Sequence, residues 1–277
     1  MRRRPGMGVL VALMVLTPRA HAETPASPPC AIERGETRAV AEVRDGETLR
    51  LDDGRMLRLV GALAPRAGDV GAPPGSWPPE RETRAALATL VEGRTITLWH
   101  DSTQRDRYGQ VLAQVTIGTG ADAMWVQGAL VSRGLARAFG RPGVDACAEA
   151  LVRLERPARD GELGVWSNAA YRLRDASAGD ELARATGAFH VVSGTVDRVS
   201  RGQGEVYVSL APRGGRDRGY SFAAVVPARG AALIGGTEPR ALQGRRVIVR
   251  GWIEQRRGPV IVIDSKGQLE LVGELLR

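Results

Sequence analysis

Two Asp-Gly pairs divide the stretch from residue 37 to residue 63 into three short runs of alternating apolar and polar residues. The runs are 37–45, 47–53 and 55–63, with Asp45-Gly46 and Asp53-Gly54 between them. An Asp-Gly pair between alternating runs is a strong signal for a tight hairpin turn. The sequence therefore predicts a three-stranded antiparallel meander at the start of the fold.

Short elements continue from this meander to residue 166. A loop rich in proline and glycine is followed by a helical pattern, two strand patterns and two more helical stretches: 79–93, 94–100, 111–117, 122–134 and 144–166. Pro157 is expected to break or bend the last of these helices. Five short strands around one intervening helix predict a closed five-stranded barrel of the oligonucleotide/oligosaccharide-binding (OB) type. A small α+β sandwich is the alternative, and the meander followed by a helix favours the barrel.

A second β pattern fills the last third of the chain. Its strand patterns are 189–200, 205–211, 220–227, 246–255, 259–265 and 268–272, with a short helix at 238–246. Residues 168–188 are small and polar, and we interpret them as a linker. The predicted fold class is therefore α+β, mainly β, with a barrel domain at 37–167 and a second, smaller OB-like β-barrel domain at 189–277.

The first 22 residues have the pattern of a secretory signal peptide. Three arginines precede a short apolar run, and Ala20-His21-Ala22 follows it. We expect cleavage after Ala22 and an exported chain, periplasmic or secreted, with residues 23–36 as an N-terminal arm. An uncleaved N-terminal anchor is the alternative, and no other segment is apolar enough to cross a membrane. Removing the four arginines and no acid of residues 1–22 lowers the formal net charge from +8 to +4, which permits polyanion binding without requiring it.

The chain has two cysteines, Cys30 and Cys147. An exported protein meets an oxidising compartment, so a Cys30–Cys147 disulfide is expected, with two buried free thiols as the alternative. This bond would tie the N-terminal arm to a helix.

Five motifs of the first domain carry a resemblance to a known family. They are "VRDGETLRL", "RLVGALAP", "RDRYGQ", "WVQGALVSRGLAR" and "GELGVWS", in this order. Together they resemble the staphylococcal nuclease, or thermonuclease, family over most of residues 37–167. The resemblance implies a five-stranded barrel with three helices. It also implies that carboxylates bind calcium, a glutamate activates water and two arginines bind the phosphate.

Matched to that pattern, this sequence departs from it at most of the functional positions. Glu47 stands at the first metal-ligand position and Arg58 keeps the first phosphate arginine. Leu63 stands at the second ligand position, Arg66 at the general base and Gln110 at the second arginine. Leucine cannot bind a cation, arginine cannot accept a proton near neutral pH, and glutamine brings no charge. The resemblance therefore implies little or no phosphodiesterase activity by the family's mechanism.

The same residues can still form a binding site. We expect an anion site from Arg58, Arg66 and Arg107, with Tyr108 available to stack on a base. The alternative is that Arg58 pairs with Glu47 while the other arginines are solvated. Glu47 is the single candidate metal ligand that remains, and calcium is expected only if an altered site is active.

The sequence thus favours an exported thermonuclease-like protein, catalytically impaired or inactive and without a cofactor, that binds nucleic acid, a nucleotide or an envelope protein. An active calcium-dependent endonuclease with an altered site is one alternative. A structural or assembly module that binds no polyanion is the other.

Overall fold

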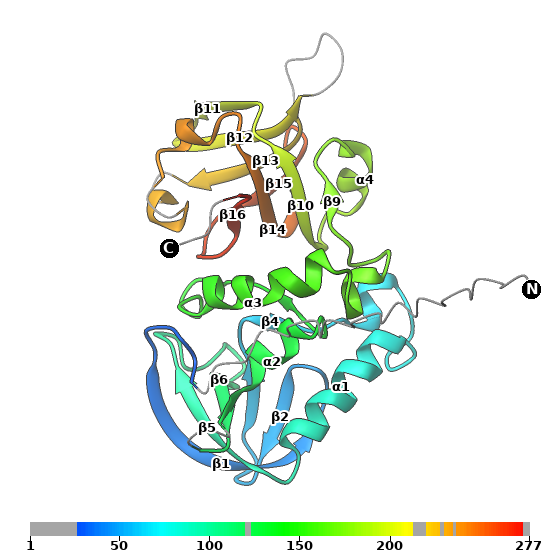
Figure 1. The fold of residues 1–277 in the computed structure, drawn as a ribbon, viewed down its shortest axis with the longest axis vertical. Helices are drawn as coiled ribbons and strands as arrows, with labels where there is room; N and C mark the ends of the chain where they lie inside the picture. Colours follow the sequence, from blue (N-terminus) through cyan, green and yellow to red (C-terminus); the bar gives the residue numbers. More distant parts are fainter. Residues whose placement is uncertain (1–26, 120–122, 213–219, 228–229, 235–236, 274–277) are drawn as a thin grey trace, which may run out of the picture.

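The computed structural model describes residues 27–119, 123–212, 220–227, 230–234 and 237–273, which fold into two β-barrel domains (Figure 1). The first barrel is the lower lobe of Figure 1 and the second is the upper lobe, with helix α3 (Ala148–Asp160) between them. The predicted signal peptide, residues 1–22, lies outside the described residues. No described helix is long and apolar enough to span a membrane.

The first barrel closes through a parallel strand pair. Its strands are β1 (Glu33–Val43), β2 (Thr48–Leu51), β3 (Met56–Leu59), β5 (Thr95–His100) and β6 (Val111–Ile117). They follow the order β3-β2-β1-β5-β6, and β3 pairs in parallel with β6 to close the ring. Leu49, Leu57, Leu98 and Val115 point into a core where each is fully buried. The predicted meander and closed five-stranded barrel are confirmed.

Helices and short strands surround this barrel. They are β4 (Ala62–Leu63), η1 (Ala67–Val70), α1 (Pro78–Val91), β7 (Met124–Trp125), α2 (Val126–Ser132), β8 (Arg137–Ala138), α3 and η3 (Gly164–Ser167). Helix α2 starts later than the expected 122–134, because Met124 and Trp125 pair with β6 instead. Pro157 does not break α3, which continues to Asp160. Pro157 has no N–H to donate, so one hydrogen bond within α3 is lost, and its carbonyl accepts the Gly161 N–H at 3.0 Å.

The second barrel repeats the strand order of the first. Its elements are β10 (Phe189–Thr195), β11 (Arg198–Gly202), β12 (Glu205–Pro212), β13 (Tyr220–Pro227), η4 (Gly230–Ile234), η5 (Pro239–Leu242), β14 (Arg246–Gln255), β15 (Pro259–Val262) and β16 (Leu269–Leu271). The order is β11-β12-β13-β15-β14-β10, with β13 and β15 parallel. This order begins at β11 and ends at β10. Because β10 and β11 are consecutive parts of one bent segment, the ring of strands is closed. The short helical turns η4 and η5 lie between the third and fourth strands of this barrel, the place along the chain that α1 has in the first barrel.

Residues 168–188, which we interpreted as a linker, are packed against the second barrel. Strand β9 (Arg174–Asp175) pairs in parallel with β10, and α4 (Gly179–Arg184) buries Leu182 in the barrel core. Tyr171 is also buried, in an apolar cluster between the two barrels. Small, polar residues in sequence do not reveal these contacts, because the apolar partners come from distant strands.

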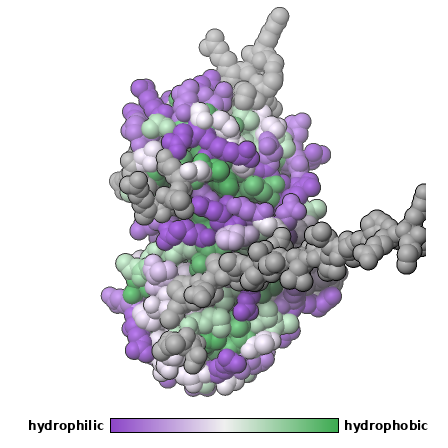
Figure 2. Space-filling model, in the orientation of Figure 1, coloured by the Kyte–Doolittle hydropathy of each residue, from purple (hydrophilic) through white to green (hydrophobic). Residues whose placement is uncertain are grey.

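The two domains meet through a buried network of charges. Glu155 and Arg159 of α3 face Arg250 of β14 and Glu270 of β16, and all four are at most 5% exposed. Arg250 donates to Glu155 at 2.6 Å and to Glu270 at 3.2 Å, and Arg159 donates to Glu270 at 2.9 Å. On the face drawn in Figure 2, hydrophilic residues cover this junction, over α3. The domains are therefore joined by desolvated ion pairs and not only by the connecting chain.

A disulfide joins Cys30 to Cys147, with Cα atoms 5.1 Å apart, and the predicted pairing is confirmed. Cys147 is the residue that precedes α3. The expected arm at 23–36 contributes its last four residues to β1. The disulfide therefore fastens the segment before β1 to the helix that carries half of the domain junction.

Candidate functional site

Glu47 enters the site from the turn between β1 and β2. The Asp45 carboxylate accepts the Glu47 N–H at 2.7 Å, and the Glu47 carbonyl accepts the Leu59 N–H at 2.8 Å. Gly46 leaves no room for a side chain, since a Cβ there would lie 2.6 Å from the Cβ of Ala64. These contacts turn the Glu47 side chain inward, where 1% of it is exposed.

Three donors surround the Glu47 carboxylate. Oε1 accepts the Ala64 N–H at 2.8 Å. Oε2 accepts from Arg66 at 2.7 Å and from Arg58 at 3.0 Å. Arg58 reaches it because β2 and β3 are antiparallel neighbours that place Thr48 opposite Arg58. We call Glu47, Arg58 and Arg66 the Glu47 triad.

Charge in the Glu47 triad is distributed unevenly between interior and surface. Burial raises the pKa of Glu47, and the neighbouring Arg66 and Arg58 oppose that rise. The arginine side chains are 27% exposed at Arg58 and 44% at Arg66, so both guanidinium groups reach solvent. With the carboxylate ionised, the triad carries one net positive charge and presents it outward.

Leu63, which stands at the second metal-ligand position implied by the resemblance, is part of the domain interface. It is 8% exposed and belongs to an apolar cluster with Phe139 of the first domain and Phe189, Val191 and Ile248 of the second. Among the described residues, no group of three or more His, Cys, Asp or Glu side chains is placed to hold a metal ion. Calcium needs several oxygen ligands, whereas here one carboxylate is already engaged by three donors and its neighbour is a leucine. The residues present do not fit a calcium ion.

Asp69, Tyr171 and Arg137 form a second polar group beside Arg66, which the sequence did not indicate. The Asp69 carboxylate accepts the Arg66 N–H at 3.1 Å and the Tyr171 O–H at 3.0 Å. Arg137 is 3.5 Å from the same carboxylate and donates to the carbonyl of Phe189 at 3.0 Å. Burial raises the pKa of Tyr171 to about 12 and lowers the pKa of Arg137. These residues fix the Arg66 segment to the second domain.

The loop with Arg107, Tyr108 and Gln110 precedes β6, the strand that pairs with the strand of Arg58. Asp106 accepts the N–H groups of Tyr108 and Gln110, both at 2.9 Å, and this holds the turn. Tyr108 is 74% exposed, and the Arg107 guanidinium lies 4.8 Å from its ring centre. Within the described part of the chain, no hydrogen bond or ion pair joins this loop to Glu47, Arg58 or Arg66. The structure therefore brings three of the predicted site residues together and leaves the other three on their own surface loop.

Comparison with known proteins gives one result for this chain. Residues 56–168 match the family model described as staphylococcal nuclease homologue. The matched stretch runs from the start of β3 to the residue after η3 and excludes β1, β2 and the whole second barrel. No curated protein matches the chain.

Proposed function

Because residues 56–168 belong to the staphylococcal nuclease homologue family, we propose that this chain is an exported nuclease homologue that binds single-stranded nucleic acid without cleaving it. The observation that carries the proposal is the Glu47 triad. The family's chemistry needs a metal and a free general base, and here Arg66 stands in the base position and pairs with the Glu47 carboxylate. Loss of a general base alone costs about 10²–10⁴ in rate.

Two features support binding by the surfaces that remain. The triad keeps one outward positive charge on Arg58 and Arg66, which suits a phosphate oxygen. Tyr108 offers an exposed aromatic face beside Arg107, and aromatic faces bind unpaired bases with little sequence preference. Export is supported by the disulfide between Cys30 and Cys147, since such bonds persist in oxidising compartments.

The test uses purified residues 23–277 with single-stranded DNA. We expect no calcium-dependent digestion and a DNA affinity that falls as salt rises. Digestion that disappears in Arg58→Ala would establish the chain as an active nuclease instead. Absence of any DNA retention at low salt would favour an assembly role.

Matched variants locate the binding surface. Tyr108→Ala should weaken DNA binding by roughly five-fold or more, because stacking on one base contributes about 1–3 kcal/mol. Arg107→Ala should weaken binding and reduce its salt dependence. Arg257→Ala, which removes an exposed charge from the second barrel, is the control and should leave DNA binding unchanged.

A further inference from the structure

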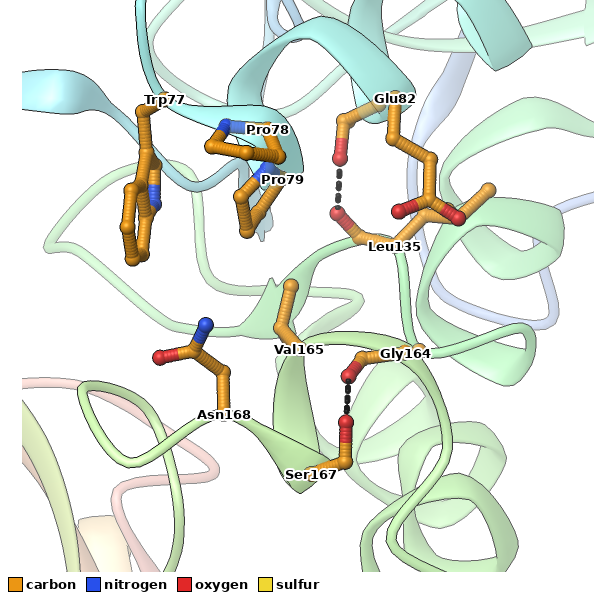
Figure 3. A pocket seen from close by; sticks show the side chains of 11 residues that line it. Trp77, Pro78, Pro79, Glu82, Leu135, Gly164, Val165, Ser167 and Asn168 are labelled. Carbon is orange, nitrogen blue, oxygen red and sulfur yellow. Dashed lines mark hydrogen bonds between the residues drawn. The ribbon is translucent and has the colours of Figure 1, made fainter.

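A pocket of about 310 Å³ lies between the start of α1 and η3, outside the Glu47 triad and the Tyr108 loop (Figure 3). Trp77, Pro78 and Pro79 form one wall, and Val165 and Asn168 stand opposite. Its volume is at the lower end of the range for small-ligand pockets. The pocket therefore has room for a single side chain or a small molecule.

Trp77 is held so that its ring stays in the wall. Its indole N–H donates to the Tyr171 O–H at 3.0 Å, and the two rings lie 6.5 Å apart. With the N–H already used, the indole offers its π surface rather than a hydrogen-bond donor. A tryptophan face is the aromatic surface that attracts a cation most strongly.

The polar groups of the pocket are mainly acceptors. Glu82 is the only charged residue of the lining, it is exposed, and it forms no hydrogen bond or ion pair with any described residue. The carbonyls of Leu135 and Gly164 also lie at the pocket, where they accept from Thr83 Oγ1 at 2.7 Å and Ser167 Oγ at 2.8 Å (Figure 3). The Leu135 carbonyl oxygen retains a second lone pair for another donor, whereas the Gly164 carbonyl also accepts the Ser167 N–H within η3.

The first two residues of α1 do not add backbone N–H donors to the acceptors of this pocket. A helix N-terminus normally attracts anions through its free N–H groups. Here the first two positions of the helix are Pro78 and Pro79, which have no N–H to donate. An anion would also meet the Glu82 carboxylate.

We propose that this pocket binds the cationic side chain, arginine or lysine, of a partner protein segment. The aliphatic stem would contact the two prolines and Val165, and the charged end would lie between the Trp77 face and Glu82. A carboxylate and an aromatic face together recognise a guanidinium or ammonium group by charge-assisted hydrogen bonds and by cation–π attraction. This inference does not depend on nucleic-acid binding.

The test is a titration of ¹⁵N-labelled residues 23–277 with N-acetyl-arginine amide, N-acetyl-lysine amide and N-acetyl-norleucine amide. The readouts are the indole resonance of Trp77, identified by its loss in Trp77→Phe, and the side-chain amide of Asn168. We expect saturable shifts at roughly millimolar concentrations of the two cationic compounds and weaker ones with norleucine. Equal binding of norleucine, or no saturable shift with either cation, would overturn the proposal.

Charge specificity is tested on the same helix. Glu82→Gln should weaken binding of the arginine compound roughly five-fold or more, because it removes the pocket's only charge. Glu92→Gln removes an equally exposed acid after the other end of α1 and should leave binding unchanged. If both variants weaken binding equally, the attraction is a general surface effect and the pocket is not the site.

Discussion

The same substitution, glutamate to glutamine, should have opposite consequences in the two buried ion clusters of this protein. Glu155→Gln leaves Arg250 and Arg159 with Glu270 as their remaining shared carboxylate, so the network keeps one uncompensated positive charge. The side chains of these arginines are 0% and 3% exposed. An uncompensated buried charge costs about 3–5 kcal/mol. Glu155→Gln is therefore expected to lower the free energy of unfolding by about that amount.

In Glu47→Gln, the arginines that lose their carboxylate partner are Arg58 and Arg66. Their side chains are 27% and 44% exposed. Water can solvate both guanidinium groups once the carboxylate charge is removed, and exposed ion pairs contribute only about 0–1 kcal/mol. The buried carboxylate itself is costly to ionise, since burial raises its pKa. We expect Glu47→Gln to stay within about 1 kcal/mol of the natural protein, or to exceed it in stability.

Urea unfolding at pH 7 measures both variants, with an unchanged slope required for the comparison. A pH series separates the contributions further. A folded-state pKa above the ordinary value of 4.5 gives stability that is fully present below pH 4.5 and is lost as pH rises through the folded pKa. Any advantage of Glu47→Gln should therefore shrink as pH falls toward 4.5. Equal losses in the two variants, or a larger loss for Glu47→Gln, would refute the claim that exposure of the arginines decides the outcome.

Three further predictions concern the interface, the disulfide and acid stability. Leu63→Asp should lower the free energy of unfolding by about 3–5 kcal/mol without creating calcium binding, because Leu63 packs between the domains; calorimetry with calcium and urea unfolding check both parts. Replacing Cys30 and Cys147 by alanine should cost about 2–5 kcal/mol, and a thermal midpoint unaffected by reductant would contradict this. Burial lowers the pKa of His190 from 6.5 to about 4, so the stability it contributes is present above pH 6.5 and lost as pH falls toward 4; His190→Gln should flatten that part of the pH profile in urea unfolding.

Local signals in the sequence were sufficient for the barrel and the disulfide. The meander depends on Asp-Gly turns between adjacent strands, and such short-range pairings are encoded where they occur. The break expected at Pro157 does not occur, because a proline removes a single N–H donor and α3 continues past it to Asp160. Strand β9 was missed, and the packing of helix α4 was not foreseen, because their partners, β10 and the core residues of the second barrel, are distant in sequence.

Of the contacts of Glu47, the pair with Arg58 was stated as an alternative from the sequence, whereas the pair with Arg66 was not. That Glu47 and Arg58 face each other follows from antiparallel register, which the sequence implies. That Arg66 also reaches Glu47 depends on the path of the chain after β4, where Asp69 accepts the Arg66 N–H. Arg137 and Arg250 carried no signal, since an arginine is normally assigned to the surface, and these two are buried at the junction between the domains.

Leu63, at the position where the resemblance implies a metal ligand, belongs to the same packing that docks the second barrel. Leu63 pairs with Arg137 across β4 and β8, and Arg137 donates to the carbonyl of Phe189 at the start of the second barrel. A carboxylate at residue 63 would have to remain hydrated, or bind a cation, at a place where Phe189 and Ile248 now exclude water. Restoring calcium chemistry would therefore require rebuilding the domain interface as well as the ligand set. The Glu47 carboxylate, left without a metal, is compensated by the two arginines that the same strand and its following loop provide.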